Sequence, residues 1–155
     1  MNAQPPPNAH VFQKRTVMHT TVAKLTAFHQ DPKALGKLSP PPIFMQIQRD
    51  TRTSLTEGEL EFTLWFAVLP IRWLAQHQPG PTATSFADLM LRGPLAYWRH
   101  EHIFEQTSDG VALVDRVTLA HKPGIAGLLT RLMFDGLPLQ FLFFYRHMRT
   151  RQAVE

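Results

Sequence analysis

The chain has 155 residues, of which 44% are hydrophobic and 18% are charged. This length and composition are typical of a single folded domain and exclude a disordered chain. No run reaches the roughly 18 apolar residues of a membrane-spanning helix, so we expect no integral membrane association. The chain contains no cysteine, which excludes disulfides, thiolate metal sites and cysteine nucleophiles.

The formal net charge of +4 does not by itself indicate a nucleic-acid partner. The basic residues are scattered, and their densest group is Arg146, Arg149 and Arg151 near the C-terminus, where they would complement the negative end of a helix dipole. We therefore expect no nucleic-acid binding. The first ten residues have neither the basic start nor the apolar core of a signal peptide, which favours a cytoplasmic location.

The N-terminal part of the chain predicts one strand and two short helices. Residues 1–9 are polar and rich in proline, which predicts a disordered leader before a single domain over 10–152. Residues 11–20 are rich in β-branched and apolar side chains and predict a strand. Helical spacing and capping residues predict helices over 21–30 and 31–38.

From Ile43 onward the hydrophobic period changes to two, which is the period of strands. Apolar side chains alternate most clearly at Leu60, Phe62, Leu64 and Phe66. The predicted strands cover residues 43–49, 60–66, 71–77, 85–92, 97–106 and 111–120. An Asp-Gly pair between the last two strands is a strong hairpin signal, and the consecutive order predicts an antiparallel meander.

Residues 125–152 predict the longest helix, with Gly136 and Pro138 kinking it or dividing it in two. Its predicted sheet-facing residues are Leu137, Phe141, Phe144, Tyr145 and Met148. The whole order predicts an α+β fold in which a curved antiparallel sheet of about seven strands surrounds the long C-terminal helix. Such a sheet holds its helix away from the concave centre, leaving space for large side chains or for a ligand.

The strand over 97–106 predicts which side chains point into that space. Its odd positions are mostly charged, so the even positions should face inward. These inward residues are Trp98, His100, His102 and Phe104. On the next strand, the apolar face also contains Asp115, which hairpin pairing places opposite Phe104 or His102.

A second carboxylate is predicted on the strand over 85–92, where one face carries Phe86, Asp88, Met90 and Arg92. A buried carboxylate is costly unless it is paired, so these polar groups should meet each other or the polar end of a ligand. The sequence therefore predicts an apolar cavity with one polar spot.

Several motifs resemble those of a known superfamily. They are SFADLMLRGPLAYWRHEHIFE at 85–105, continued by Asp115 and Val117, together with LSPPP at 38–42, LPIRW at 69–73 and FYRHMRTRQ at 144–152. Over residues 11–152 the chain resembles the START-like, or SRPBCC, ligand-binding superfamily, in its uncharacterised bacterial cyclase/dehydrase-like branch. This resemblance implies a helix-grip (Bet v 1-like) fold with an internal hydrophobic cavity, and no catalytic residues to carry over. Met90 departs from the pattern, where a polar residue is expected.

The polar residues admit three interpretations. His100 and His102, with Asp115 or Asp88, could bind a metal, but the spacing is common by chance and no fourth ligand is evident, so we predict no metal and no cofactor. As an acid–base set, the same four residues could serve a cyclase or dehydratase, with Asp115 orienting His102. The favoured interpretation makes them hydrogen-bonded members of the cavity wall.

We therefore expect a noncatalytic protein that carries or senses a small hydrophobic or lipid-like molecule. The predicted ligand-binding residues are Phe62, Leu64, Phe66, Trp73, Phe86, Met90, Trp98, His100, His102, Phe104, Val117, Phe141 and Tyr145. Two alternatives stay open. One is a small cyclase or dehydratase, and the other is a protein-interaction module that acts through its basic C-terminus, which is compatible with a homodimer.

Overall fold

A computed structural model describes residues 4–155 of the chain. Part of the leader predicted over residues 1–9 therefore lies outside the described residues. Residues 4–9 contain a turn but no helix or strand, and Ala9 N–H donates to the Pro6 carbonyl at 2.9 Å. Regular structure begins at His10.

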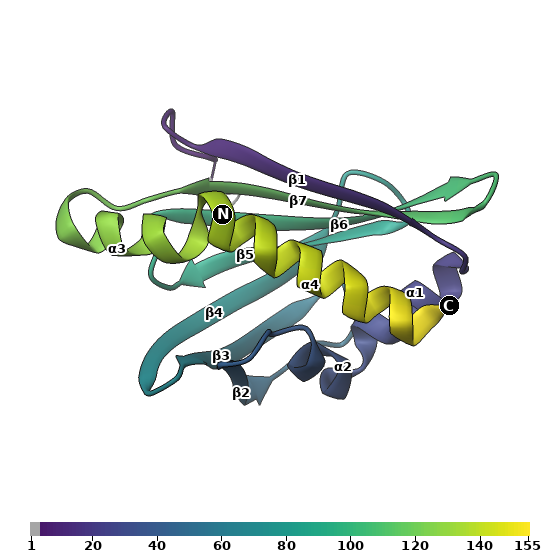
Figure 1. The fold of residues 1–155 in the computed structure, drawn as a ribbon, viewed down its shortest axis with the longest axis horizontal. Helices are drawn as coiled ribbons and strands as arrows, with labels where there is room; N and C mark the ends of the chain where they lie inside the picture. The colour runs from purple at the N-terminus through teal and green to yellow at the C-terminus, as the bar shows by residue number, and fades with distance from the viewer. Residues whose placement is uncertain (1–3) are drawn as a thin grey trace.

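Seven strands form one antiparallel sheet with the order β1-β7-β6-β5-β4-β3-β2. The elements in chain order are β1 (His10–Met18), α1 (Val22–Gln30), α2 (Pro32–Lys37), β2 (Ile43–Asp50), β3 (Gly58–Phe66), β4 (Leu69–Pro79), β5 (Ser85–Arg92), β6 (Tyr97–Thr107), β7 (Gly110–Ala120), α3 (Gly124–Phe134) and α4 (Gly136–Val154). The helix α4 crosses one face of the curved sheet, and α1 and α2 lie below its C-terminal half (Figure 1). The predicted α+β architecture is confirmed.

Short polar side chains start the helices at the predicted places. Thr21 Oγ1 accepts from the Lys24 N–H at the start of α1, and Asp31 accepts from the Lys33 N–H at the start of α2. Asp135 accepts from Gly136 N–H and begins α4, so the long C-terminal helix is divided there. Pro138 falls in the first turn of α4, where its missing N–H costs no helical hydrogen bond.

The prediction of which side of the C-terminal helix faces the sheet is wrong. Leu137, Phe141, Phe144 and Met148 are 37 to 78% exposed, and Tyr145 is only partly buried. The side that packs on the sheet carries Leu139, Phe143, His147, Thr150 and Val154. Both sides of α4 contain large apolar residues, and the buried side also contains two polar residues, so the apolar pattern alone indicated the wrong face.

Two large core clusters lie beneath α4, and a third, smaller cluster joins Leu89, Tyr97 and Ala120 of the sheet. One cluster joins Phe62, Trp73 and Trp98 of the sheet to Phe134 and Phe143 of the C-terminal helices. The other gathers residues near the turn of the β6–β7 hairpin and the end of α4, namely Met18, Leu25, Leu55, Phe86, Phe104, Val111, Leu113 and Val154. The cavity described below is lined by residues of both clusters.

The helix α3 is apolar but contributes little to the core. Ile125, Leu128, Leu129 and Leu132 are each more than half exposed. Among the described residues, no single helix is long and apolar enough to cross a membrane. The pair α3 and α4, bent by 41°, meets those criteria together by length and composition only, as core helices of folded domains also do.

The two sides of α4 can be tested with adjacent phenylalanines. Phe143 is fully buried and Phe144 is 54% exposed. Phe143→Ala should lower the free energy of unfolding by about 3–5 kcal/mol, because it leaves a cavity in the core. The matched Phe144→Ala should lower it by less than about 1 kcal/mol. Urea denaturation measures both values, and a larger loss for Phe144→Ala would contradict the packing described here.

Candidate functional site

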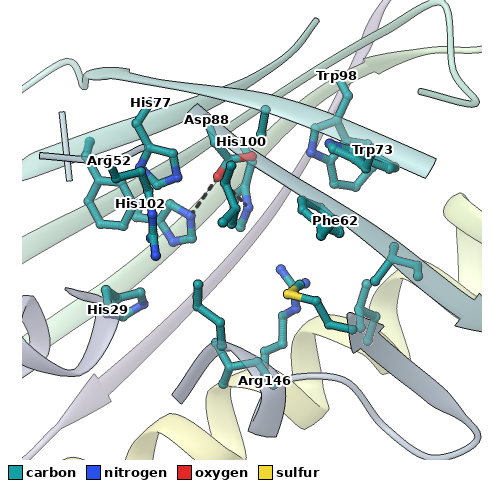
Figure 2. Close-up of a pocket in the computed structure, with 18 of the residues that line it drawn as sticks. His29, Arg52, Phe62, Trp73, His77, Asp88, Trp98, His100, His102 and Arg146 are labelled. Atoms are coloured by element: carbon teal, nitrogen blue, oxygen red, sulfur yellow. Dashed lines mark hydrogen bonds and ion pairs between the residues drawn. The ribbon is translucent and has the colours of Figure 1, made fainter. Parts of the chain in front are cut away.

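A cavity lies between the sheet and the helices α1, α2 and α4. Its volume is about 100 Å³. The residues that line it are His29, Leu35, Leu38, Met45, Arg52, Leu60, Phe62, Leu64, Trp73, Ala75, His77, Phe86, Asp88, Trp98, His100, His102, Phe134, Leu142 and Arg146. Aromatic side chains gather on one side of the cavity and histidines on the other (Figure 2).

Three rings from three neighbouring parts of the sheet build the aromatic side. Phe62 of β3 and Trp73 of β4 are register partners and stack with ring centroids 6.0 Å apart. Trp98 of β6 meets Trp73 edge-on at 5.6 Å. These contacts are favourable geometries for aromatic pairs, so this wall is ordered without help from a ligand.

The histidine side is built on the central strands β5, β6 and β7. Asp88 is the register partner of His100, and Asp115 is the register partner of His102, as one of the two predicted hairpin registers required. His102 Nε2 donates to Asp88 Oδ2 at 3.2 Å, and His100 Nε2 donates to Asp115 Oδ1 at 3.0 Å. The predicted meeting of two carboxylates and two imidazoles is therefore confirmed.

A third histidine, which the sequence analysis did not connect to this group, comes from α4. His147 Nε2 donates to Asp115 Oδ2 at 2.9 Å, and its Nδ1 lies 2.7 Å from Thr16 Oγ1. His102 Nδ1 lies 3.0 Å from Asp115 Oδ1 but out of line for a hydrogen bond, and it has no hydrogen-bond partner among the described residues. Asp115 thus ties the sheet to the helix that covers it.

Opposite charges set the protonation of this cluster. Burial lowers the pKa of His102, but Asp115 and Asp88 raise it more strongly, to about 9. Burial would raise the pKa of both aspartates, yet the neighbouring His100 and His102 bring both below the ordinary value. Burial and the charge of His102 lower the pKa of His100. At neutral pH, therefore, His102 is a cation between two carboxylates and His100 is neutral.

Two further histidines of the lining are held in one tautomer by backbone carbonyls. Because a carbonyl only accepts, His29 Nδ1 donates to Leu25 O at 2.8 Å and His77 Nδ1 donates to Leu55 O at 2.9 Å. Burial, and then the charge of His102, lowers the pKa of His29 to about 3. Burial also lowers the pKa of His77. Both rings are neutral at pH 7, and their Nε2 atoms carry the acceptor lone pair.

Arg146 brings a second cation to the cavity. Its side chain reaches from α4 toward the middle of the cavity (Figure 2), with the guanidinium carbon 5.4 Å from the Phe143 ring centroid. Its buried Nε has no hydrogen-bond partner among the described residues. Burial lowers the Arg146 pKa, and the charges of Asp115 and Asp88 oppose that shift. By contrast, Arg52 is paired with Asp50 at 2.6 Å.

The structure brings only part of the predicted ligand-binding set to the cavity. Those in the lining are Phe62, Leu64, Trp73, Phe86, Trp98, His100 and His102. Those outside it are Phe66, Met90, Phe104, Val117, Phe141 and Tyr145. Phe104 and Val117 are buried in the core, whereas Phe141 is 57% exposed because α4 packs through its other side. Arg92, predicted inward, is exposed and lies 3.9 Å from Glu61.

Asp88, His100 and His102 offer ligand atoms within 4.8 Å of one another, a spacing at which a metal ion could be held. The protonation of these side chains is better suited to a network of paired charges than to a metal site. The raised pKa of His102 places a proton where a metal would need a lone pair, and His100 Nε2 is engaged with Asp115. The arrangement can donate hydrogen bonds and protons into an otherwise apolar cavity.

This cluster should give stability a pH optimum. The folded pKa of His102, about 9, exceeds the unfolded value of about 6.5, so its contribution is complete below pH 6.5 and is lost as the pH rises to 9. We expect a loss on the order of a few kcal/mol over that window. His29 acts oppositely, because its folded pKa near 3 makes stability fall as the pH drops below 6.5.

Urea denaturation at pH 6.5, 7.5 and 9 checks the alkaline loss. In His102→Gln the loss should largely disappear, whereas the exposed His19→Gln should retain the wild-type profile. A wild-type free energy of unfolding that stays constant or increases from pH 6.5 to 9 would contradict the assigned charge of His102.

Comparisons with known proteins support the fold. No family model matches the chain, and no curated protein matches it. Similar solved structures include protein CV1439 from Chromobacterium violaceum, with a TM-score of 0.70 and 12% identity over 94% of this chain and 98% of that one. The Zhui aromatase/cyclase from Streptomyces sp. R1128 has a TM-score of 0.67 and 12% identity, covering 94% of this chain and 91% of that one.

A START superfamily protein from Mycobacterium smegmatis gives the same TM-score of 0.67, with 11% identity over 94% of this chain and 97% of that one. At such identities the likeness concerns the fold alone. The seven-stranded antiparallel sheet, the two short helices after β1 and the long C-terminal helix agree with it. This chain has the helix-grip fold of the START-like superfamily.

Proposed function

We propose that this protein binds a small, mostly apolar molecule in the cavity beneath α4, as a carrier or sensor in the cytoplasm. The observation that carries the proposal is a mostly apolar cavity with its histidines gathered on one side and Arg146 reaching toward its middle. Ligand pockets commonly combine apolar walls with a few convergent polar groups. The similarity to a START superfamily protein supports the same class of function, because proteins of this fold bind hydrophobic ligands.

The size of the cavity limits the ligand. A dry cavity of about 150 Å³ binds benzene, and the present cavity of about 100 Å³ is smaller, so a whole ring enters only if part of the lining moves. Leu35, Met45 and Leu142 are only partly buried and mark the side on which the lining approaches solvent. A larger ligand requires these side chains to move.

Unpaired donors indicate what the ligand presents to the polar side. Among the described residues, His102 Nδ1 and Arg146 Nε are the buried side-chain nitrogens or oxygens without a hydrogen-bond partner, and both residues line the cavity. A buried donor left unpaired costs about 1–3 kcal/mol. A ligand that brings a hydrogen-bond acceptor to Arg146 would remove that cost.

The charges favour a neutral acceptor over an anion. The carboxylates of Asp88 and Asp115 are opposed by the cations of His102 and Arg146, and Arg52 is paired with Asp50. A ligand carboxylate would add an uncompensated negative charge to a buried site, which is costly. The ligand class we propose is therefore a ring-sized apolar molecule with a carbonyl or hydroxyl oxygen.

Acetophenone and ethylbenzene test this class, because they share size and shape and differ in the carbonyl oxygen. A hydrogen bond to a charged donor contributes about 1.5 kcal/mol or more, so wild-type protein should bind acetophenone at least about tenfold more tightly. Chemical-shift titration by NMR gives both affinities. Arg146→Met should abolish the preference while keeping ethylbenzene affinity.

Arg149→Met is the matched control, because Arg149 lies on the same helix outside the cavity lining. It should keep the wild-type preference, and a thermal melt should confirm that both variants are folded. Failure of wild-type protein to bind either molecule, together with no copurified ligand in native mass spectrometry, would contradict the proposed function.

A second candidate is a dehydratase or cyclase, favoured by the protonated His102 at the cavity wall and by the aromatase/cyclase among the structural neighbours. A protonated imidazole can give its proton to a leaving hydroxyl, which departs as water, while a neutral imidazole of the lining such as His77 takes the proton from the adjacent carbon. Dehydration of 4-hydroxy-4-phenylbutan-2-one to the conjugated enone, followed by absorbance, tests this activity. The rate should fall as the pH rises through 9 and in His102→Gln. Equal rates for the variant and wild type would exclude a role for His102.

A further inference from the structure

Outside the cavity, the structure joins two histidines and one aspartate that are far apart in the sequence. His10 begins β1, His121 follows β7, and Asp135 lies between α3 and α4. His10 Nε2 is 3.2 Å from Asp135 Oδ1, and His121 Nε2 is 3.1 Å from Asp135 Oδ2. The two rings stack with centroids 6.1 Å apart, so both Nε2 atoms converge on one carboxylate.

A hydrogen bond from a neighbouring helix fixes the orientation of His121. Thr130 Oγ1 donates its single hydrogen to the Gly127 carbonyl at 3.1 Å. The same oxygen lies 2.9 Å from His121 Nδ1, so it must accept there and His121 Nδ1 must carry a proton. In the neutral ring, Nε2 is then a bare lone pair that faces a carboxylate oxygen. Two lone pairs at 3.1 Å need a cation between or beside them.

The separations fit ligands that share one metal ion. Nitrogen and carboxylate ligands sit about 2.0–2.1 Å from a zinc ion, so two ligands at a tetrahedral angle lie roughly 3.3 Å apart. The two His–Asp separations are close to this, and all three ligand atoms lie within 4.8 Å of one another. His10 is 45% exposed and can adjust, while the side chain of His121 is 1% exposed and held in place.

We propose that His10, His121 and Asp135 bind a divalent transition-metal ion through the two Nε2 atoms and the carboxylate. Two imidazoles and one carboxylate are a ligand set for such ions, with solvent completing the coordination. Thr130 does not bind the metal ion itself, but its hydroxyl holds His121 in the tautomer that leaves Nε2 free. Such outer contacts are typical partners of metal-binding histidines.

A metal ion at this site would connect three parts of the chain. His121 precedes α3 and Asp135 follows it, so a metal there fixes both ends of this helix against the first residue of β1 at one end of the molecule (Figure 1). The helix buries only Gly127, Thr130 and Phe134. A metal ion would therefore anchor an element that has few other buried contacts, and bound metal should raise thermal stability.

A proton is the competing cation, because an imidazolium at His121 or His10 would also satisfy Asp135. The test uses the full chain without an affinity tag, freed of metal by dialysis against a chelator. Zinc binding is measured by calorimetry at pH 7.5, and Co²⁺ absorbance reports the coordination. We expect one zinc ion per chain, a rise in melting temperature with zinc, and affinity at least tenfold weaker in His10→Gln.

Asp135→Asn should weaken zinc affinity to a similar extent, and the asparagine can still cap α4, which separates metal binding from helix stability. Asp88→Asn removes a ligand from the cavity cluster and should leave zinc binding unchanged. No zinc binding by wild-type protein, or wild-type affinity in both His10→Gln and Asp135→Asn, would overturn the proposal. Zinc binding lost in Asp88→Asn alone would do the same by placing the ion in the cavity.

Discussion

The burial of Asp115 is the constraint on which the interior of this protein depends. Its side chain is only 4% exposed, so the carboxylate must be compensated inside the fold. His100 and His102 on the adjacent strand supply part of that compensation, and His147 supplies the rest from α4. Because His147 must reach Asp115, the helix is held over the centre of the sheet, with Phe143 packed beside it. The cavity is the space that this arrangement leaves, and its polar side is the outer part of the same cluster.

The two sides of the cavity have different consequences for a ligand. The aromatic wall of Phe62, Trp73 and Trp98 is shaped by contacts among the rings themselves and offers only apolar area. The polar side offers hydrogen-bond donors, and its positive and negative charges cancel. It can therefore bind a neutral ligand oxygen without attracting an anion. This combination explains why His100-x-His102 is better understood as a wall than as a metal site, although its spacing suits a metal. The better metal-ligand geometry lies elsewhere, where Thr130 leaves a histidine lone pair facing Asp135.

Local patterns predicted the features that short-range geometry determines. The alternation along residues 97–106 showed which side chains face inward, and the tight hairpin turn restricted Asp115 to two partners, one of which was right. Long-range docking decided the rest. His147 and Arg146 entered the site because α4 packs through Leu139 and Phe143 rather than through Phe141 and Phe144. The four-residue spacing of Leu139, Phe143 and His147 was the available signal, but its polar member disguised the buried face. His10, His121 and Asp135 share no spacing, so only the folded chain shows that they meet.

The charge of His102 is the most direct test of this account, because the pairing of both buried carboxylates depends on it. Nitrogen-15 NMR of the imidazole rings distinguishes an imidazolium from a neutral ring and can be read for each histidine at pH 7.5. We expect His102 to be an imidazolium at this pH, titrating near 9, and His29 to be neutral with its proton on Nδ1. A neutral His102 at pH 7.5, titrating at or below 6.5, would contradict this expectation.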